Sequence, residues 1–354
     1  MSFINNWLRK DIQDIQAYHV PSAQQMLKLD AMESPFALPE ETIKQYLTHL
    51  SAQEINRYPD PGATTLMQSL RELMQIDPAF GVLLGNGSDE LIQLLALACE
   101  SGDSILSVEP SFVMYQMIAK FTHLNYQGVA LGDNYELDVE AFLAAMDEHQ
   151  PKLIFIAYPN NPTGNSFKRA DIQRIIEATD AMVVLDEAYY AYADDSFLDD
   201  IARYENLVVL RTVSKIGFAG LRLGLLIGAQ QTVDELNKLR LPYNINTLTQ
   251  VSAQFLLQQH EMIEENARVI MDERTRLFAA LSKISALHVY PSQANFILLK
   301  TPDANALFEH LKQNNILIKN LSQAPALDDC LRITIGAPEQ NDLLMATVSA
   351  YYGQ

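Results

Sequence analysis

The chain has 354 residues, of which 48% are hydrophobic, and its 44 acidic residues outnumber 25 basic ones to give a formal net charge of −19. This length and composition indicate a globular protein with a large core and two domains. The acidic charge disfavours nonspecific nucleic-acid binding, and no apolar run is long enough to predict a membrane span or a secretion signal.

The first part of the chain predicts helices separated by proline-rich segments. Residues 1–38 are expected to be irregular because several prolines would interrupt a long helix. Short helices are expected over 39–50 and 64–76, and in the second of these leucines recur on one face. The segment 57–62 between them contains two prolines and a glycine, which predicts a rigid turn.

From residue 81 onward, short apolar runs alternate with helical segments. This alternation predicts an α/β fold with a mostly parallel sheet between helices, in which ligands bind beyond the carboxyl ends of the strands. The expected strands are 81–84, 104–108, 124–130, 152–157, 181–185 and 207–210, followed by an apolar run at 221–228. The expected helices are one that opens near 88 and others at 110–120, 137–149 and 169–179.

The pattern changes after residue 247. A mainly helical stretch extends to about residue 284, which is too long for an ordinary crossover and suits a connection between domains. The rest of the chain is typical of a small α+β domain. We therefore predict a large domain at 40–255 and a small domain formed by 1–39 together with 256–354.

Polar residues that could bind a ligand follow the expected strand at 207–210. Thr212, Ser214 and Lys215 come where this strand ends, and Arg222 stands at the start of the next apolar run. A lysine there is well placed to lose its proton and attack a carbonyl carbon, and hydroxyls with an arginine suit a phosphate. These residues suggest a Schiff-base lysine that holds a phosphorylated aldehyde. The alternative is a loop lysine with a surface arginine.

Two further strand ends carry candidates. The loop 85–90 opens a helix whose first N–H groups form an anion site, unless Ser88 or Asp89 merely caps that helix. Asp186 ends a very apolar strand and needs a cation, which a protonated pyridine nitrogen would supply. Tyr189 could then hydrogen-bond the phenolic oxygen of the same ring. A helix cap, or a metal ligand shared with Glu187, is the alternative for Asp186.

The remaining candidates are an asparagine and two cations. The loop 158–164 is stiffened by two prolines and could present the Asn161 amide at a fixed point, although a plain turn could use the same residues. Arg332 lies in an otherwise apolar strand and needs an anionic partner, either a structural carboxylate or a substrate. Lys319 ends the strand before it and is a candidate second cation for the same anion.

In this order, these motifs resemble those of the fold-type I, pyridoxal-phosphate-dependent aminotransferases over nearly the whole chain. The markers are Asn160 to Gly164, Asp186 to Tyr189, Ser214-Lys215, Arg222 and Arg332. Within this superfamily the chain is most similar to the histidinol-phosphate aminotransferase family, through residues 28–33, 57–60 and 330–336. The resemblance implies a large domain with a mostly parallel sheet between helices, a small α+β domain and pyridoxal 5′-phosphate as the cofactor.

The resemblance also implies roles for individual residues. Lys215 would bind the cofactor's aldehyde carbon and carry the proton, Asp186 would keep the ring nitrogen protonated, and Asn161 and Tyr189 would bind the phenolic oxygen. Phe112, at a position that is often tyrosine, would stack on the ring. The implied phosphate ligands are Ser88, Asp89, Thr212, Ser214 and Arg222.

Substrate and subunit contacts follow from the same resemblance. Arg332 would bind a substrate carboxylate or phosphate, with Lys319, Tyr18 and Asn161 as further substrate contacts. Tyr58 would reach the site of a neighbouring subunit, which implies a homodimer.

The implied function is transamination between L-histidinol phosphate and 2-oxoglutarate in histidine biosynthesis. The alternatives on the same fold are an aromatic amino-acid aminotransferase and a threonine-phosphate-type decarboxylase. A regulatory protein that only senses the cofactor is disfavoured by the short segment before the fold and by the acidic charge. Cys99 and Cys330 show no pairing pattern and the histidines no ligand-like spacing, so we expect a cytoplasmic protein without a metal site.

Overall fold

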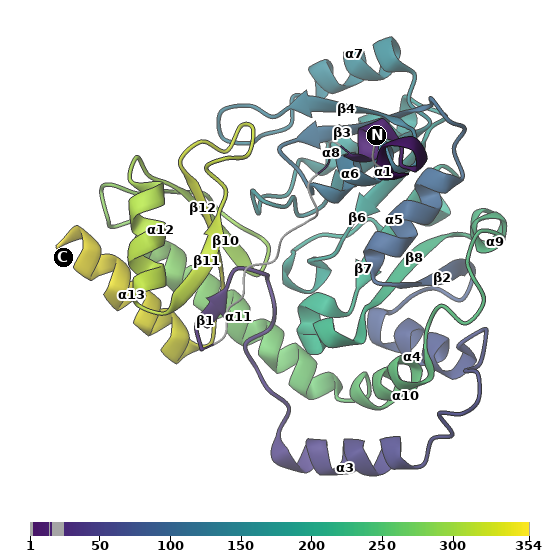
Figure 1. Ribbon diagram of the computed structural model, residues 1–354, viewed down its shortest axis with the longest axis horizontal. Coiled ribbons are helices and arrows are strands. Elements are labelled where there is room, and N and C mark those ends of the chain that lie inside the picture. Colours follow the sequence, from purple (N-terminus) through teal and green to yellow (C-terminus); the bar gives the residue numbers. More distant parts are fainter. Residues whose placement is uncertain (1–2, 14, 16–24, 354) are drawn as a thin grey trace.

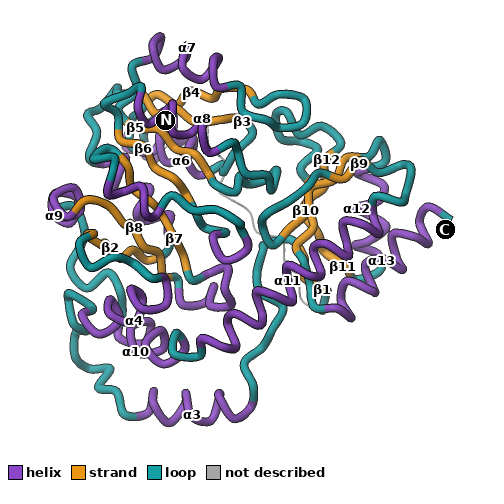
Figure 2. The backbone as a smooth tube through the Cα atoms, turned by 180° about the vertical axis from the view of Figure 1, so that it is seen from behind, coloured by secondary structure: helices purple, strands orange, loops and turns teal. Residues whose placement is uncertain are grey.

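The described part of the protein is built on two β-sheets, with a hydrophobic core on each face of the larger sheet and a separate core beside the smaller one (Figure 1). The computed structural model describes residues 3–13, 15 and 25–353. Tyr18, one of the predicted substrate contacts, lies outside the described residues. The larger sheet with its helices forms one part of the molecule, and the smaller sheet with the last helices of the chain forms the other (Figures 1 and 2).

The larger sheet confirms the predicted α/β architecture. In spatial order its strands are β2 (Phe80–Asn86), β8 (Leu223–Ala229), β7 (Leu207–Thr212), β6 (Met182–Asp186), β5 (Leu153–Ala157), β3 (Ser104–Glu109) and β4 (Asn125–Ala130). The strands from β4 to β7 are parallel, whereas β8 is antiparallel to both β7 and β2. The sheet is therefore mostly parallel, and the strands β5, β6 and β7 end at one edge.

Helices cover both faces of the larger sheet. In β6, Val183 and Leu185 enter one core and Val184 enters the other, so the strand is buried on both sides, as its continuous apolar run predicts. The helices of the first face are α4 (Thr64–Met74), α7 (Val139–His149), α8 (Arg169–Glu177) and α10 (Thr247–Leu256). Those of the second face are α5 (Ser88–Leu97), α6 (Met114–Phe121) and α9 (Gln230–Asn237). Outside α10 lies α3 (Glu40–Ser51), whose Tyr46 hydroxyl is 2.7 Å from Oγ of Ser252.

The smaller sheet is mostly antiparallel. In spatial order it comprises β1 (Leu27–Leu29), β11 (Ile316–Asn320), β12 (Cys330–Thr334), β10 (Phe296–Lys300) and β9 (His288–Val289). Only β1 and β11 run parallel among these pairs of described strands. Its core is completed by α11 (His260–Leu281), α12 (Ala304–Gln313) and α13 (Pro338–Tyr352).

The long helix α11 joins the two parts. Ile263 near its start belongs to the core of the larger sheet, whereas Ala267 and the later buried residues belong to the core of the smaller one. The helical stretch expected after residue 247 therefore runs between the two parts. The predicted boundary at residues 255 and 256 falls at the end of α10 and stays a prediction.

The N-terminal segment contacts both parts. The predicted small domain includes residues 1–39, and β1 indeed pairs with β11 of the smaller sheet. By contrast, Arg9, between α1 (Phe3–Trp7) and α2 (Lys10–Gln13), donates hydrogen bonds to the carbonyls of Lys120 and Phe121 at the end of α6 (3.0 and 2.9 Å). The segment between the first two helices therefore contacts the part built on the larger sheet.

Candidate active site

A cavity of about 210 Å³ lies where β5, β6 and β7 end, which is the edge at which a ligand site was predicted. It brings together most of the predicted site residues, although they come from separate strands and loops. The lining residues are Ala31, Met32, Glu33, Ser88, Asp89, Phe112, Ala157, Asn161, Asp186, Ala188, Tyr189, Thr212, Ser214, Lys215, Ala219 and Arg222.

Asp186 is a buried carboxylate at the end of β6. Its Oδ2 accepts a hydrogen bond from the Tyr115 hydroxyl (2.7 Å), and its Oδ1 accepts one from the Ala188 backbone N–H (3.1 Å). Burial raises the pKa of Asp186 to about 6, although these two hydrogen bonds oppose the shift. A carboxylate in this environment is suited to pair with a cationic group of a ligand.

Lys215 lies in a one-turn helix, Ser214–Phe218, that follows β7. Its Nζ donates to the carbonyl of Ala31 (3.4 Å) and is 5.8 Å from the centre of the Tyr189 ring. Burial, together with the positive charge of Arg332, lowers the pKa of Lys215 to about 8. At pH 7 roughly a tenth of the side chain is then the neutral amine, far more than for an ordinary lysine, and this is the form that attacks carbonyl carbons.

A group of polar residues in the lining of the cavity is suited to a phosphate. Ser88 and Asp89 begin α5, and the hydroxyls of Thr212 and Ser214 are hydrogen-bonded to each other (2.8 Å). Gly87 precedes the helix with φ 84°, and a Cβ at this position would lie 2.6 Å from Nη2 of Arg222. The absence of a side chain there lets Arg222, whose Nη2 lies 3.3 Å from Oδ2 of Asp89, approach the helix N-terminus, where one anion could contact both. This set of donors fits the phosphate of the cofactor that the resemblance implies.

Arg332 reaches this site from the smaller sheet. It is buried in β12, donates to Oδ1 of Asn161 and donates to the backbone carbonyl of Asp30 (3.2 Å). Lys319 lies directly opposite Arg332 on β11, so their side chains share one face of the sheet. The predicted pair of cations is therefore placed together, beside an asparagine that lines the cavity.

Tyr58 is placed differently from the other predicted residues. It is 80% exposed and stacks on Tyr243, with ring centres 4.4 Å apart. The described residues that line the cavity do not include it. Its predicted contact with a neighbouring subunit stays a prediction.

Sequence reasoning missed Tyr115 and the segment Ala31–Glu33. A buried aspartate needs hydrogen-bond donors, so the sequence does predict a donor for Asp186. It does not indicate that this donor is Tyr115, because α6 lies far from Asp186 in the sequence. Ala31 to Glu33 reach the cavity because Met32 is held on both sides: its N–H donates to Oγ1 of Thr334 (3.0 Å) and its carbonyl accepts from Asn295 (3.0 Å).

The alternative of a metal site shared by Asp186 and Glu187 does not fit this geometry. Asp186 lines the cavity, whereas the carboxylate of Glu187 binds Arg211 on the other face of the sheet. Adjacent strand residues point to opposite faces, so the two carboxylates do not converge on one ion.

The comparison with known families decides the class of the protein. Residues 24–348 match the family model described as aminotransferase class I and II. The chain belongs to the class I and II aminotransferases. The predicted fold class and aminotransferase activity are thereby confirmed.

Relatives of this aminotransferase are similar to it over their full length. It is 64% identical over 352 residues to the histidinol-phosphate aminotransferase of Vesicomyosocius okutanii subsp. Calyptogena okutanii, covering 99% of both chains. It is 46% identical to histidinol-phosphate aminotransferase 2 of Nitrosococcus oceani, covering 98% of both. The crystal structure of histidinol-phosphate aminotransferase from Sinorhizobium meliloti in complex with pyridoxal-5′-phosphate shares its fold, with a TM-score of 0.86, 23% identity and 98% of both chains covered. No helix within the described part of this aminotransferase is long and apolar enough to cross a membrane.

Proposed function

We propose that this aminotransferase transfers the amino group of L-histidinol phosphate to 2-oxoglutarate, giving imidazole acetol phosphate and L-glutamate in histidine biosynthesis. The observation that carries the proposal is the 64% identity, over 99% of both chains, to a histidinol-phosphate aminotransferase. The paired cations Arg332 and Lys319 agree with it, because a phosphate monoester approaches two negative charges at neutral pH and a carboxylate has one.

The cofactor we propose is pyridoxal 5′-phosphate, and the residues of the cavity fit its groups. Asp186 would face the ring nitrogen, Asn161 and Tyr189 the phenolic oxygen, and Phe112 the ring face. The groups suited to hold the phosphate are the first N–H groups of α5 at Ser88 and Asp89, with the side chains of Thr212, Ser214 and Arg222. When bound, this cofactor acts as an electron sink for negative charge at the substrate's α-carbon.

The protein's own groups would divide the remaining work. Nζ of Lys215, with its lowered pKa, is the base that removes a proton from the α-carbon and returns it. Asp186, with a pKa near 6, is mostly ionised at neutral pH and keeps a cationic partner protonated. Arg332 orients the substrate by its anionic group, and the buried walls exclude water from the proton transfer.

A substrate panel tests this proposal directly. The purified protein with pyridoxal phosphate and 2-oxoglutarate is given L-histidinol phosphate, phenylalanine or phosphothreonine, and glutamate and carbon dioxide are measured. We expect the highest kcat/KM for histidinol phosphate. A higher value for phenylalanine would favour the aromatic aminotransferase, and release of carbon dioxide from phosphothreonine would favour the decarboxylase.

Replacing Lys319 with alanine should weaken the use of a phosphorylated amine more than that of a simple amino acid. A charge-assisted hydrogen bond contributes about 1.5–3 kcal/mol, so kcat/KM for histidinol phosphate should fall roughly ten- to hundredfold. The value for phenylalanine should change little. Lys300→Ala, an exposed lysine on β10 of the same sheet, is the matched control. Equal losses on both substrates would place Lys319 outside the phosphate pocket.

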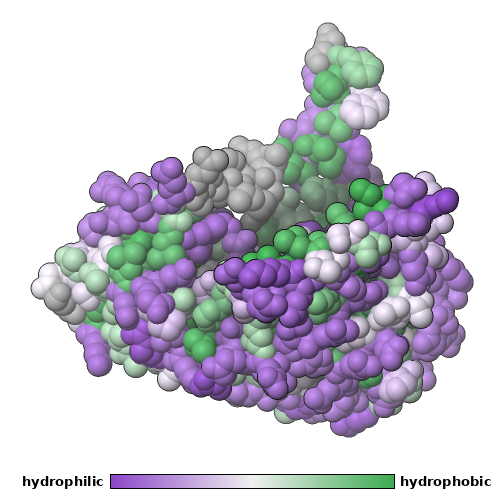
Figure 3. All heavy atoms as spheres, turned by 90° about the horizontal axis from the view of Figure 1, so that it is seen from below, coloured by the Kyte–Doolittle hydropathy of each residue, from purple (hydrophilic) through white to green (hydrophobic). Residues whose placement is uncertain are grey.

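We also propose a cytoplasmic homodimer. Apolar side chains are exposed around the stacked pair Tyr58 and Tyr243, where Ile55 and Leu241 are 75% and 72% exposed. Apolar residues in such a group suit contact with another protein surface. Figure 3 shows hydrophobic residues at the surface of one face of the molecule, some of them on a projecting part. Free thiols at Cys99 and Cys330 agree with a reducing compartment.

Mixing two defective variants tests the dimer and the role of Tyr58 together. Lys215→Ala and Tyr58→Ala should each have low activity alone. If Tyr58 completes the partner's site, a mixed dimer has one intact site, and random reassociation should restore about a quarter of the parental activity. Two Lys215→Ala preparations mixed in the same way are the control. No recovery in a mixture shown to contain mixed dimers would remove Tyr58 from the partner's site.

A further inference from the structure

A buried ion pair lies directly behind the candidate active site. Asp186 on β6 and Thr212 on β7 line the cavity, and the residues next to them, Glu187 and Arg211, lie on the other face of the sheet. Oε2 of Glu187 accepts from Nε (3.1 Å) and Nη2 (2.9 Å) of Arg211. The two side chains are only 1% and 6% exposed. The pair therefore joins the ends of two strands that carry cavity residues.

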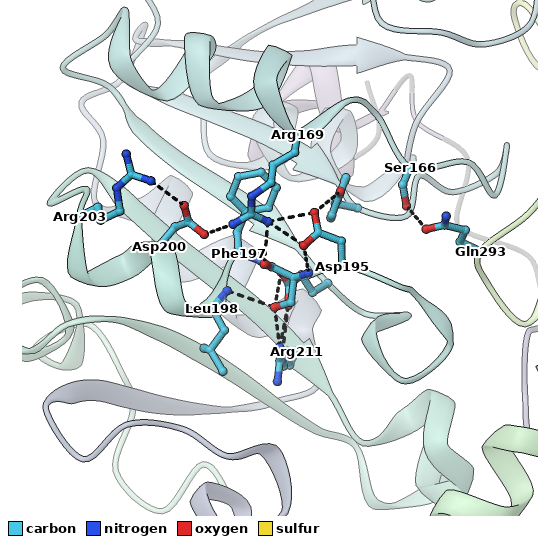
Figure 4. Close-up of polar contacts among 12 residues, drawn as sticks. Ser166, Arg169, Asp195, Phe197, Leu198, Asp200, Arg203, Arg211 and Gln293 are labelled. Atoms are coloured by element: carbon cyan, nitrogen blue, oxygen red, sulfur yellow. Dashed lines mark hydrogen bonds and ion pairs between the residues drawn. The ribbon is translucent and has the colours of Figure 1, made fainter.

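The ion pair is completed by the segment that contains Ser196 and Phe197. The Ser196 hydroxyl lies 2.8 Å from Oε2 of Glu187 and accepts from Nη2 of Arg211 (2.8 Å), while the Phe197 N–H donates to Oε1 of Glu187 (2.6 Å). Figure 4 shows Arg211 beside this segment, which Arg169 holds in turn through ion pairs with the residues on either side, Asp195 and Asp200. Both charges of the pair thus have hydrogen-bond partners within the protein.

Arg211 also holds the far end of the turn that carries Tyr189. Its guanidinium carbon lies 4.5 Å from the centre of the Tyr190 ring, a cation–π contact. The Tyr190 N–H donates to the carbonyl of Glu187 (3.0 Å) and closes the turn between them. The guanidinium of Arg211 therefore contacts both ends of the turn, at Glu187 and at Tyr190. The cavity residue Asp186 immediately precedes Glu187 in the chain, and the cavity residue Tyr189 immediately precedes Tyr190.

Stability alone does not require a charged pair at this position. Apolar residues of similar volume can replace a buried ion pair with little loss of stability, because the desolvation cost of the charges offsets their attraction. Bidentate geometry and ring stacking instead restrict orientation. We propose that Glu187 and Arg211 are positioning residues, which hold Asp186 and Tyr189 in the orientation that the reaction needs. This inference rests on the proposed pyridoxal phosphate site.

The test replaces the pair as a unit. In the variant Glu187→Leu with Arg211→Met, we expect a lower thermal midpoint, because the Phe197 N–H and the Ser196 hydroxyl lose their acceptor. In the folded protein we expect a kcat lowered roughly ten- to hundredfold, the scale of a small misplacement in a catalytic site. The dissociation constant of pyridoxal phosphate, measured by fluorescence titration of the apoprotein, should rise. KM for histidinol phosphate should change less, because Arg332 and Lys319 are untouched.

The control is another ion pair, which is less buried and does not line the cavity. Glu273 and Arg276 are 2.7 Å apart on α11, and Arg276 also binds Asp342 of α13. Glu273→Leu with Arg276→Met should leave kcat and cofactor affinity unchanged. A Glu187→Leu, Arg211→Met protein that keeps the parental kcat and cofactor affinity would overturn the positioning role.

A milder pair of variants serves if the double variant does not fold. Tyr190→Phe keeps a ring beneath Arg211, whereas Tyr190→Leu removes it. We expect a lower kcat and weaker cofactor binding for Tyr190→Leu and near-parental values for Tyr190→Phe. Equal values for the two would overturn the role of Arg211 in holding the turn. A parent protein that fails to bind pyridoxal phosphate would instead overturn the proposed function itself.

Discussion

Replacing Lys215 with alanine should abolish transamination while the protein remains folded and still binds pyridoxal phosphate noncovalently. Nζ of Lys215 is a cavity nitrogen whose pKa is lowered to about 8, so it can act both as a nucleophile and as a base. Proton transfer by a positioned side chain contributes about 10²–10⁴-fold on its own. With covalent attachment also lost, we expect kcat to fall roughly 10³-fold or more.

Two measurements check this result. Turnover of histidinol phosphate is compared between the parent and the variant, and borohydride reduction followed by mass spectrometry identifies the lysine that carries the cofactor. The parent should be labelled at Lys215. Lys152→Ala is the matched control, because Lys152 precedes β5 at the opposite edge of the sheet and should leave turnover unchanged. Near-normal turnover of Lys215→Ala, with label on another lysine, would contradict the assignment.

The parts of the site that sequence reasoning found are those that parallel-sheet geometry places together. Asp186, Thr212 and Lys215 each follow an apolar strand, and the carboxyl ends of neighbouring parallel strands meet at one edge. Reading the strands in order therefore predicted the position of the cavity. Ser88 and Arg222 were found in the same way, since each stands beside a strand of the larger sheet.

The parts that were missed depend on contacts between distant segments. Tyr115 lies on a buried helix face and looks like an ordinary core residue until Asp186 is placed opposite it. The strand β1 has only three residues, too few to show a period, and its partner β11 lies near the other end of the chain. The helix predicted at 110–120 begins at Met114, which leaves Phe112 free to face the cavity.

The ion pair of Glu187 and Arg211 shows a further limit of sequence reasoning. Glu187 stands within a recognised motif and Arg211 in the strand before another, and neither position reveals which face of the sheet the side chain occupies. The register between β6 and β7 supplies that information, because Asp186 lies opposite Leu210 and the next residues then pair on the reverse face. Strand register is a tertiary property, and one residue of slip would exchange the two faces.

Replacing Asp186 with asparagine should lower turnover by orders of magnitude and, at neutral pH, should not destabilise the apoprotein. A neutral amide no longer keeps the ring nitrogen of the cofactor protonated, so negative charge at the α-carbon loses its sink. The amide oxygen can accept the hydrogen bond from the Ala188 N–H, while the amide NH2 group can donate to the oxygen of Tyr115. Parental rate constants in this variant would assign Asp186 to a capping role at the turn it shares with Ala188.

The stability of the apoprotein gives this prediction a second, independent signature. The pKa of Asp186 is raised by burial from 3.8 to about 6, so between about pH 4 and pH 6 the unfolded chain releases this proton while the folded protein keeps it. The unfolded state then binds fewer protons, and the contribution of Asp186 to the free energy of unfolding falls as the pH rises through this window. It is fully present below the unfolded pKa and lost above the folded one. About two pKa units correspond to roughly 3 kcal/mol.

Urea unfolding of both apoproteins at pH 4 and pH 7 measures this difference. Because asparagine does not titrate, the free energy of unfolding of the variant relative to the parent should rise by roughly 2 kcal/mol between the two pH values, slightly less than the full difference because the unfolded aspartate is already partly ionised at pH 4. At pH 7, saturating pyridoxal phosphate should make the parent more stable than the variant. The ionised aspartate of the parent then has a cationic partner, and a ligand adds more stability to the protein that binds it more tightly. Equal stabilisation of both proteins by the cofactor would show that Asp186 does not face the ring nitrogen, whatever the loss of turnover.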